Sequence, residues 1–285
     1  MKRHIEFFDV DHFEKNYHRV KPAAGLENFI DFFWETKFDR LPPQYPEEFS
    51  DVLFPNIGYT YLINLGTPFV MELGGKKFNM RSDGFLPRRE ALECFHRRGN
   101  ILFGIKFKIS PVIFQKKINF AEYDGYISPL SYLMDPKIIE AVKAAGSFRE
   151  RVRLLNQYFQ TIVSSYSGSL RSVDITQEIM QQCNAGNSFD TPVESIAARY
   201  DISARTLQRY FEKTTGTGTK DALQVMRIRK AASNLAMSPE DFDYSNYGYY
   251  DYSHFCRHLR GFFGEKTIEG MQPHLRLLRK LKIED

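Results

Sequence analysis

Three polar side chains on one short segment have the chemistry needed to read nucleic-acid bases. Arg205, Gln208 and Arg209 stand three and four positions apart, so in a helix they share one face. Arg can donate two hydrogen bonds to guanine O6 and N7, and Gln can pair in the same bidentate way with adenine N6 and N7. Leu207 and Phe211 fall on the opposite face and are expected in the core. The pattern predicts a recognition helix, and spacing alone leaves open the alternative of a solvated charged face on an ordinary helical hairpin.

The flanking residues predict two short helices joined by a tight turn. In Thr191-Pro192-Val193-Glu194, Thr suits the N-cap, Pro the first helical position, and Glu completes a capping box. Ser203 is a second N-cap, directly before the segment that carries the two arginines. Two such helices form a helix-turn-helix pattern.

Charge is concentrated around this pattern. Residues 199–230 hold eight basic and three acidic side chains, a net charge of +5 against +4 for the whole chain. A basic stretch of this kind is expected beside phosphates.

A longer helix is predicted over 220–235. Beyond it lies a second unit whose helix covers 253–260, with Gly264 ending the element. Residues 240–260 carry a net charge of −2, so this second unit is expected to hold DNA less firmly.

Several short motifs follow one another along the last hundred residues. They are Ile196-Ala197, Ile202-Ser203, Arg205 to Phe211, Gly216, Arg227 and Ala231, followed by Gly248-Tyr249-Tyr250-Asp251, Ser253, Phe255, Arg257, Phe263 and Gly264. Together they resemble the AraC family of bacterial transcription regulators over residues 172–275. Two departures are Gly218-Thr219 and Lys266-Thr267, where the family often has Ser-Pro after each conserved glycine. A third is Asp243-Tyr244, which replaces the usual Ile-Ala of the second unit.

The resemblance implies double-stranded DNA as partner and a set of DNA-binding residues in two units. These are Arg205, Thr206, Gln208, Arg209 and Lys213 in the first unit, and Ser253, His254, Arg257 and Arg260 in the second. A joining helix of 16 residues spans about 24 Å, whereas adjacent major grooves on one side of a duplex recur about every 34 Å. Two recognition helices can enter adjacent major grooves if the DNA bends or the units splay.

The first 130 residues carry short apolar runs separated by Pro and Gly, which predict a β-rich barrel or sandwich. Gly74-Gly75 predicts a tight hairpin between 69–73 and 76–80, and a second, looser hairpin is predicted over 91–109. Trp34 is placed in a further strand. The region also resembles, more weakly, the cupin-like sensor or dimerisation domains that precede the DNA-binding region in some AraC-family members. The fold class is therefore α+β multidomain, with a β-rich domain over 1–168 and two helix-turn-helix units over 169–285.

A helix beginning at Ser147 has an apolar stripe with spacings of 4, 3, 4 and 3, formed by Phe148, Val152, Leu155, Phe159 and Ile162. The stripe fits either the seam of a homodimer or packing onto its own barrel. The many rings of the β-rich part fit either a filled core or an aromatic pocket for a small-molecule effector.

Composition excludes several classes of protein. The chain has 285 residues, 42% hydrophobic and 26% charged, which excludes disordered and collagen-like chains. No apolar run approaches the roughly 18 residues of a membrane span, and the N-terminus lacks a signal-peptide pattern, so a cytoplasmic protein is expected without membrane partners. Cys94, Cys183 and Cys256 lie too far apart to form a metal-binding motif. The seven histidines are scattered, with His96 alone in its strand region, so no metal, no cofactor and no enzyme activity are expected.

Two alternatives to a DNA-binding regulator remain open. One is a cupin-like enzyme with a helical docking module, which clustered metal ligands in the barrel would favour. The other is a dimerisation or scaffold protein without DNA binding, which the acidic second unit favours and the two arginines of the first unit disfavour.

Overall fold

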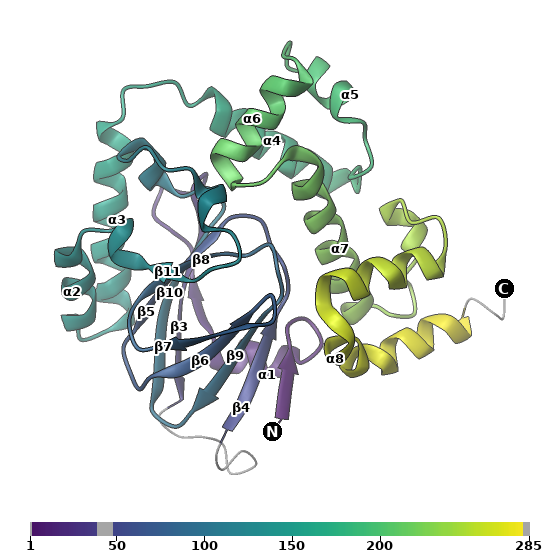
Figure 1. Ribbon diagram of the computed structural model, residues 1–285, viewed down its shortest axis with the longest axis horizontal. Helices are drawn as coiled ribbons and strands as arrows, with labels where there is room; N and C mark the ends of the chain where they lie inside the picture. The colour runs from purple at the N-terminus through teal and green to yellow at the C-terminus, as the bar shows by residue number, and fades with distance from the viewer. Residues whose placement is uncertain (1, 39–47, 282–285) are drawn as a thin grey trace.

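The computed structural model describes residues 2–38 and 48–281, with side chains except those of 264–266 and 277–281. A β-rich part comes first and a helical part follows, as predicted (Figure 1). The strands are β1 Lys2–Ile5, β2 His18–Val20, β3 Ile30–Phe38, β4 Glu48–Leu53, β5 Tyr59–Asn64, β6 Phe69–Leu73, β7 Lys76–Met80, β8 Gly84–Pro87, β9 Leu92–Arg97, β10 Asn100–Phe107 and β11 Ser128–Pro129. The α-helices are α1 Val10–Asn16, α2 Pro136–Ala144, α3 Phe148–Ser165, α4 Arg171–Gly186, α5 Val193–Ala198, α6 Ala204–Thr215, α7 Thr219–Met237 and α8 Tyr252–Leu281, with short 3-10 turns that include η2 Phe120–Tyr123 and η4 Tyr244–Tyr247.

The strands form two sheets. Sheet A has the order β1-β4-β9-β6-β7, and sheet B has the order β11-β8-β5-β10-β3-β2. The tight hairpin is confirmed: Leu73 pairs with Lys76, and Gly74 and Gly75 take the positive φ values of 55° and 78° that a two-residue turn needs. In sheet B, Trp34 lies opposite Gly104, where a Cβ would overlap the indole ring.

The predicted hairpin over 91–109 is wrong. β9 pairs with β4 and β6 in sheet A, whereas β10 pairs with β3 and β5 in sheet B. The chain crosses between the sheets at Gly99, whose φ is 83°. Sequence period reveals a strand and its buried face, but the partner of each strand is set by long-range packing.

The apolar stripe of α3 packs on its own domain. Leu155 and Phe159 are fully buried in a core shared with sheet B, and the ring of Phe159 lies 5.5 Å from that of Phe107. Ser147 caps the helix through Glu150 N at 3.2 Å, as predicted. Of the two alternatives for this stripe, packing onto its own β-rich part is confirmed, and the seam of a homodimer is contradicted because the stripe is already covered.

The first helix-turn-helix unit has its own core. Ile196 and Ala197 of α5, Leu207 and Phe211 of α6, and Leu223 of α7 are all buried in it. Ser203 caps α6 by accepting a hydrogen bond from Thr206 N at 3.1 Å, as predicted. The predicted capping box at Thr191 is wrong, because its hydroxyl donates to Ser188 O and α5 begins without a side-chain cap.

The second unit differs from its prediction in length. Gly264 does not end its helix, since α8 continues to Leu281. The Tyr252 hydroxyl nevertheless donates to Leu275 O at 3.2 Å, and a straight helix would separate residues 23 positions apart by about 35 Å. The helix therefore bends back on itself, as Figure 1 shows.

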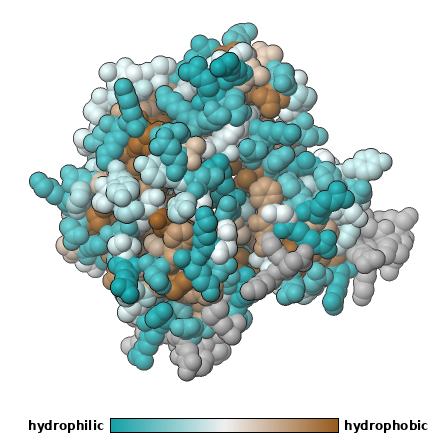
Figure 2. Space-filling model, in the orientation of Figure 1, coloured by the Kyte–Doolittle hydropathy of each residue, from teal (hydrophilic) through white to brown (hydrophobic). Residues whose placement is uncertain are grey.

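One hydrophobic core joins the two parts of the chain. It combines Ile5 and Phe54 of the β-rich part with Phe255, Phe263 and Met271 of α8. Figure 1 shows α7 running between the sheets and α8. On the face shown in Figure 2, polar residues predominate and hydrophobic residues form small separate groups. Among the residues described, no helix is long and apolar enough to cross a membrane.

Candidate nucleic-acid interface

The turn between α5 and α6 sets the angle at which α6 is presented. Asp201 adopts φ of 52°, a left-handed conformation that Asp tolerates better than most residues with a Cβ. The amides of Tyr200 and Ile202 both donate to Ala197 O, at 3.1 and 3.3 Å. The chain thus leaves α5 and enters α6 within a few residues.

α6 has one buried face and one basic face. Leu207 and Phe211 are fully buried, while Arg205, Arg209 and Lys213 are exposed. The structure therefore places these three predicted DNA-binding residues on a solvent-facing surface that begins at a capped N-terminus. Thr206 is half-buried, and its hydroxyl lies 3.0 Å from Ser203 Oγ.

Gln208 is already engaged within the protein. Its Oε1 accepts from Thr219 N, the first residue of α7, at 3.1 Å. Its Nε2 donates to Glu212 Oε1 at 2.8 Å. Both bonds would have to break for the amide to pair with a base, whereas the exposed side chains of Arg205 and Arg209 have no such bonds among the described residues.

The second unit presents fewer charges. Asp251 Oδ1 accepts from His254 N at 2.6 Å and caps α8, and Ser253, Arg257 and Arg260 are exposed, while His254 is half-buried. The sequence argument missed Tyr250, which precedes this cap and is 93% exposed. A hydroxyl so placed at the entrance of the second unit can donate to a phosphate oxygen.

The basic stretch over 199–230 does not all face DNA. Arg229 pairs with Glu6 at 2.7 Å, Lys230 donates to Asn184 O, and the Arg227 guanidinium stacks 3.9 Å from the centre of the Tyr249 ring. The five exposed basic residues are Arg199, Arg205, Arg209, Lys213 and Lys220. The net charge of the stretch therefore overstates its electrostatic footprint on DNA.

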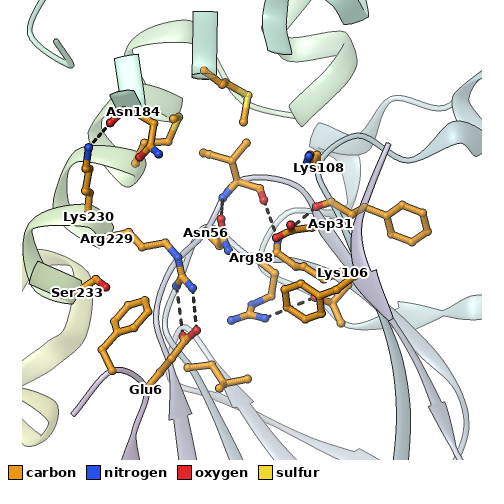
Figure 3. Close-up of a pocket in the computed structure, with 18 of the residues that line it drawn as sticks. Glu6, Asp31, Asn56, Arg88, Lys106, Lys108, Asn184, Arg229, Lys230 and Ser233 are labelled. Carbon is orange, nitrogen blue, oxygen red and sulfur yellow. Dashed lines mark hydrogen bonds and ion pairs between the residues drawn. The ribbon is translucent and has the colours of Figure 1, made fainter. Parts of the chain in front are cut away.

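A cavity of about 510 Å³ lies between the β-rich part and the helices (Figure 3). Its walls come from the N-terminal segment, sheet B, α4 and α7. Phe7, Trp34, Ile57, Met180 and Met226 are among its apolar lining. Its volume falls within the range of small-molecule sites.

Basic groups dominate the polar lining of this cavity. They are Arg19, Arg88, Lys106, Lys108, Arg229 and Lys230, against the acids Glu6 and Asp31. Lys106 Nζ donates to Ile57 O at 2.7 Å and to Phe107 O at 3.3 Å. Burial, reinforced by the charge of Arg88, holds the pKa of Lys106 well below its usual 10.5, and burial also lowers the pKa of Arg88. Arg88 Nε has no hydrogen-bond partner among the described residues. The cavity is therefore short of negative charge.

The prediction that the histidines are scattered is wrong for three of them. His4, His12 and His96, from three separate elements, surround the carboxylate of Asp51 inside the β-rich part. No spacing in the sequence shows this convergence, because strand pairing and the packing of α1 bring the residues together.

The fold and the α5–α6 face define a helix-turn-helix protein, and a comparison with protein families agrees. A family model described as a helix-turn-helix domain matches residues 196–268, which confirms the AraC-type resemblance of this region. A search of curated proteins found no match.

Solved structures of low similarity include two of ToxT and one of CuxR. ToxT from Vibrio cholerae O395 shares 12% identity at a TM-score of 0.44, covering 93% of this chain and 98% of that chain. ToxT from V. cholerae strain SCE256, bound to an unsaturated fatty acid, shares 10% identity at a TM-score of 0.41. That match covers 77% of this chain and 92% of that chain. The AraC-like transcriptional activator CuxR shares 9% identity at a TM-score of 0.30, and the match covers 79% of this chain and 89% of that chain.

Proposed function

We propose that this protein is a sequence-specific transcription regulator that reads double-stranded DNA through α6 and the first turns of α8. The observation that carries the proposal is the exposed face of α6, where Arg205, Arg209 and Lys213 stand opposite buried Leu207 and Phe211. In helix-turn-helix proteins the N-terminal residues of the second helix contact base edges in the major groove.

The length of α7 fits binding to two grooves. Its 19 residues span about 28 Å, closer to the roughly 34 Å repeat of the duplex than the 16 residues expected from sequence. The remaining difference requires modest DNA bending, at a cost of about 1–6 kcal/mol. The first unit carries the stronger charge, so it supplies most of the affinity.

Selection of genomic DNA fragments with the purified full chain tests this proposal. We expect one enriched motif, and Arg205→Ala should reduce its enrichment by removing about 1–3 kcal/mol of base discrimination. Arg153→Ala is the matched control, because Arg153 is an exposed arginine on α3, away from α6. Equal retention of all fragments by the unaltered chain, or equal effects of the two variants, would contradict sequence-specific reading.

We also propose that the cavity in Figure 3 takes a small organic anion as effector. The excess of basic groups and the buried Lys106, held only by carbonyl oxygens, favour a carboxylate or phosphate paired with an apolar body. Glu6 and Arg229 belong to both the cavity wall and the contact between the two parts, so an anion there would act on how the helices are held.

A thermal-shift screen of aliphatic carboxylates, aromatic carboxylates and phosphate esters on the full chain tests the effector proposal. At least one compound should give a saturable rise in melting temperature. Lys106→Met should abolish that rise, because it keeps the buried stem but removes the ammonium, whereas Lys116→Met on the exposed surface should leave it unchanged. The effector proposal fails if no compound gives a shift or if the shift survives Lys106→Met.

A further inference from the structure

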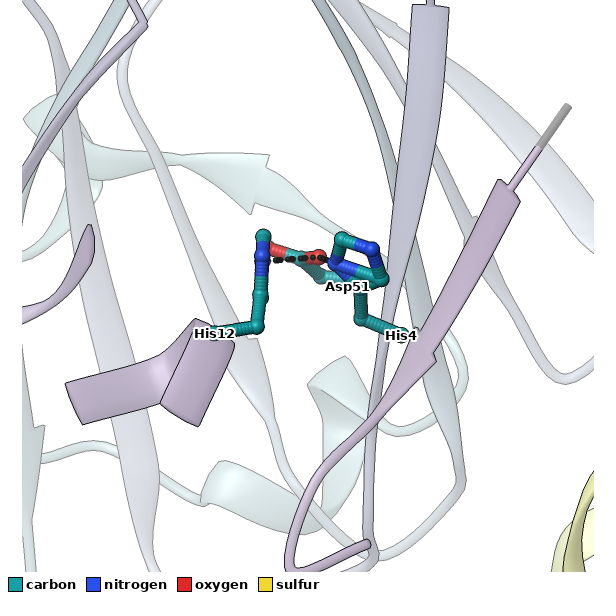
Figure 4. Close-up of side chains that lie close together, drawn as sticks. All are labelled: His4, His12 and Asp51. Carbon is teal, nitrogen blue, oxygen red and sulfur yellow. Dashed lines mark ion pairs between the residues drawn. The ribbon is translucent and has the colours of Figure 1, made fainter. Parts of the chain in front are cut away.

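Four polar side chains meet between sheet A and α1. β1 and β4 run parallel, and their register places His4 beside Asp51. β9 pairs with β4 on its other side and contributes His96, while α1 contributes His12 from above the sheet. Figure 4 shows His4 and His12 turned toward the Asp51 carboxylate from two different elements.

The distances in this cluster suit a metal ion. His12 Nε2 lies 2.9 Å and His4 Nδ1 lies 3.7 Å from Asp51 Oδ1, and His96 Nε2 lies 3.3 Å from Asp51 Oδ2. The ligand atoms of His4, His12 and Asp51 all lie within 4.8 Å of one another. With metal–ligand bonds of about 2.0–2.2 Å, a tetrahedral site places its ligand atoms roughly 3.4 Å apart.

The hydrogen bonds around the cluster also favour a cation. His96 Nδ1 lies 2.7 Å from Asn100 Oδ1, which can only accept, so Nδ1 donates to it and Nε2 faces the Asp51 carboxylate. A ring nitrogen that donates to a fixed oxygen while the other faces the ion is typical of metal-ligating histidines.

Burial makes this arrangement costly without a cation. Asp51 is fully buried and His96 is 1% exposed, while the His12 side chain is 12% exposed at the edge of the cluster. Among the described residues, Asp51 Oδ1, His12 Nε2 and His96 Nε2 have no partner in hydrogen-bond geometry, although they lie within ion-pair distance. The Tyr17 hydroxyl donates to Asp51 Oδ2 at 2.6 Å and helps to fix the carboxylate.

We propose that His4, His12 and Asp51 bind a divalent transition-metal ion of the zinc class, with His96 beside them as a fourth ligand. Two or three imidazoles with one carboxylate suit Zn²⁺, Fe²⁺ and Ni²⁺ better than Mg²⁺ or Ca²⁺, which prefer oxygen ligands alone. A metal ion can reach the cluster from solvent at His12, whose side chain is partly exposed. This proposal stands whether or not the chain regulates transcription.

The ion would clamp the segment that holds the helical part. His4 and His12 flank Ile5 to Asp11, within which Glu6 pairs with Arg229 of α7. The ring of Phe8 lies 4.7 Å from that of His274 of α8. Phe7 adopts φ of 71°, a left-handed conformation that a Phe side chain disfavours, so this turn depends on its surroundings to stay formed. Fixing both ends of the segment orders these contacts.

Titration of the chelator-treated full chain with Co²⁺ and with Zn²⁺ tests the proposal. We expect one ion per chain, intense visible d–d absorption with Co²⁺ as a four-coordinate site gives, and bleaching of that absorption by Zn²⁺. His12→Gln should lower the affinity by 100-fold or more. It is the variant of choice because His12 lies at the edge of the core, and Asp51→Asn is the second variant.

Three controls keep the outcome decisive. His18→Ala removes an exposed histidine of β2, and His254→Ala with His258→Ala removes the i, i+4 pair on α8. Neither change should alter the affinity for Co²⁺ or Zn²⁺. Circular dichroism of apo His12→Gln should match that of the unaltered apo chain, and hydrogen exchange over 5–11 should slow on metal addition only in the unaltered chain. No binding by the unaltered chain, or unchanged affinity in folded His12→Gln, would overturn the site.

Discussion

Replacing Glu6 by Gln should weaken the attachment of α7 to the β-rich part by a measurable amount. Arg229 meets the Glu6 carboxylate with both terminal nitrogens, Nη2 at 2.7 Å from Oε1 and Nη1 at 3.3 Å from Oε2. Glu6 Oε2 also accepts from Phe54 N at 2.8 Å. Gln keeps the shape and an acceptor for Phe54 N, so the substitution removes the negative charge facing Arg229 and places an amide donor where Oε1 accepts from Nη2.

The burial of this pair sets the expected loss. The Arg229 and Glu6 side chains are 22% and 14% exposed. Breaking a fully buried pair by removing one partner costs about 3–5 kcal/mol, whereas an exposed pair is worth about 0–1 kcal/mol. The intermediate exposure places the loss for Glu6→Gln at about 2–3 kcal/mol in the free energy of unfolding, since Arg229 keeps carbonyl contacts to Phe54 and Pro55.

Urea denaturation of the full chain, in a double-mutant cycle with Arg229→Met, measures this loss. The double variant should lose about 1.5–3 kcal/mol less than the sum of the single variants, because the second substitution removes the charge that the first left unpaired. Lys21→Met is the control, since its pair with Asp31 is 78% and 33% exposed and should cost less than about 1 kcal/mol. Additive losses, or equal losses for Glu6→Gln and Lys21→Met, would refute the reasoning.

The Glu6–Arg229 pair also makes the free energy of unfolding depend on pH in the acid range. Burial alone would raise the pKa of Glu6, but the charge and hydrogen bonds of Arg229 outweigh it and bring that pKa below the usual value of 4.5. The folded state therefore binds fewer protons than the unfolded state just below pH 4.5, and the contribution of Glu6, present above that pH, is lost as the pH falls further. Glu6→Gln should remove this part of the pH dependence.

Three further predictions concern the helices. Arg209→Ala should relax sequence preference by about 1–3 kcal/mol per contacted base, whereas Lys213→Ala should weaken binding to all sequences equally and make the salt dependence shallower, as fluorescence anisotropy against several duplexes would show. Leu155→Asp should unfold the β-rich part, at a cost above about 3 kcal/mol, because Leu155 is fully buried; a folded monomer by sedimentation would contradict this. Burial, with Arg227, lowers the pKa of His258 to about 4, so stability should rise with pH between about 4 and 6.5, and His258→Gln should remove about 1–2 kcal/mol of that rise in thermal melts, after allowance for solvent screening.

Local pattern predicted much of the fold. The Gly74-Gly75 hairpin, the Ser147 and Ser203 caps and the buried face of α6 all follow from interactions within a few residues along the chain. These features depend on backbone conformation and on i, i+3 and i, i+4 neighbours, which a single sequence displays directly. The exposed positions of Arg205 and Arg209 follow from the same periodicity.

Long-range pairing limited the prediction of the rest. Whether β9 pairs with β10 or with strands of the other sheet depends on which strand edges are free when the sheets form. The residues near Gly99 do not indicate which pairing occurs. The convergence of His4, His12 and His96 on Asp51 depends on the same pairing. In the sequence, Arg229 is one more basic residue near a recognition helix. In the structure it forms an ion pair with the carboxylate of Glu6, 223 positions away.

The first dozen residues are where the proposed sites meet. His4 and His12 belong to the metal cluster, and Glu6 and Phe7 line the cavity, so one short segment borders both. The segment reaches α7 through Arg229, and the N-terminus of α7 is bonded to Gln208 of the recognition helix. Two ligands that both order this segment would be coupled, and linkage requires that each then raise the affinity of the other by the same factor. An anion that binds more tightly in the presence of Zn²⁺ must therefore also tighten Zn²⁺ binding, whereas equal affinities with and without the ion would mean that the segment is already fully ordered in the unliganded chain.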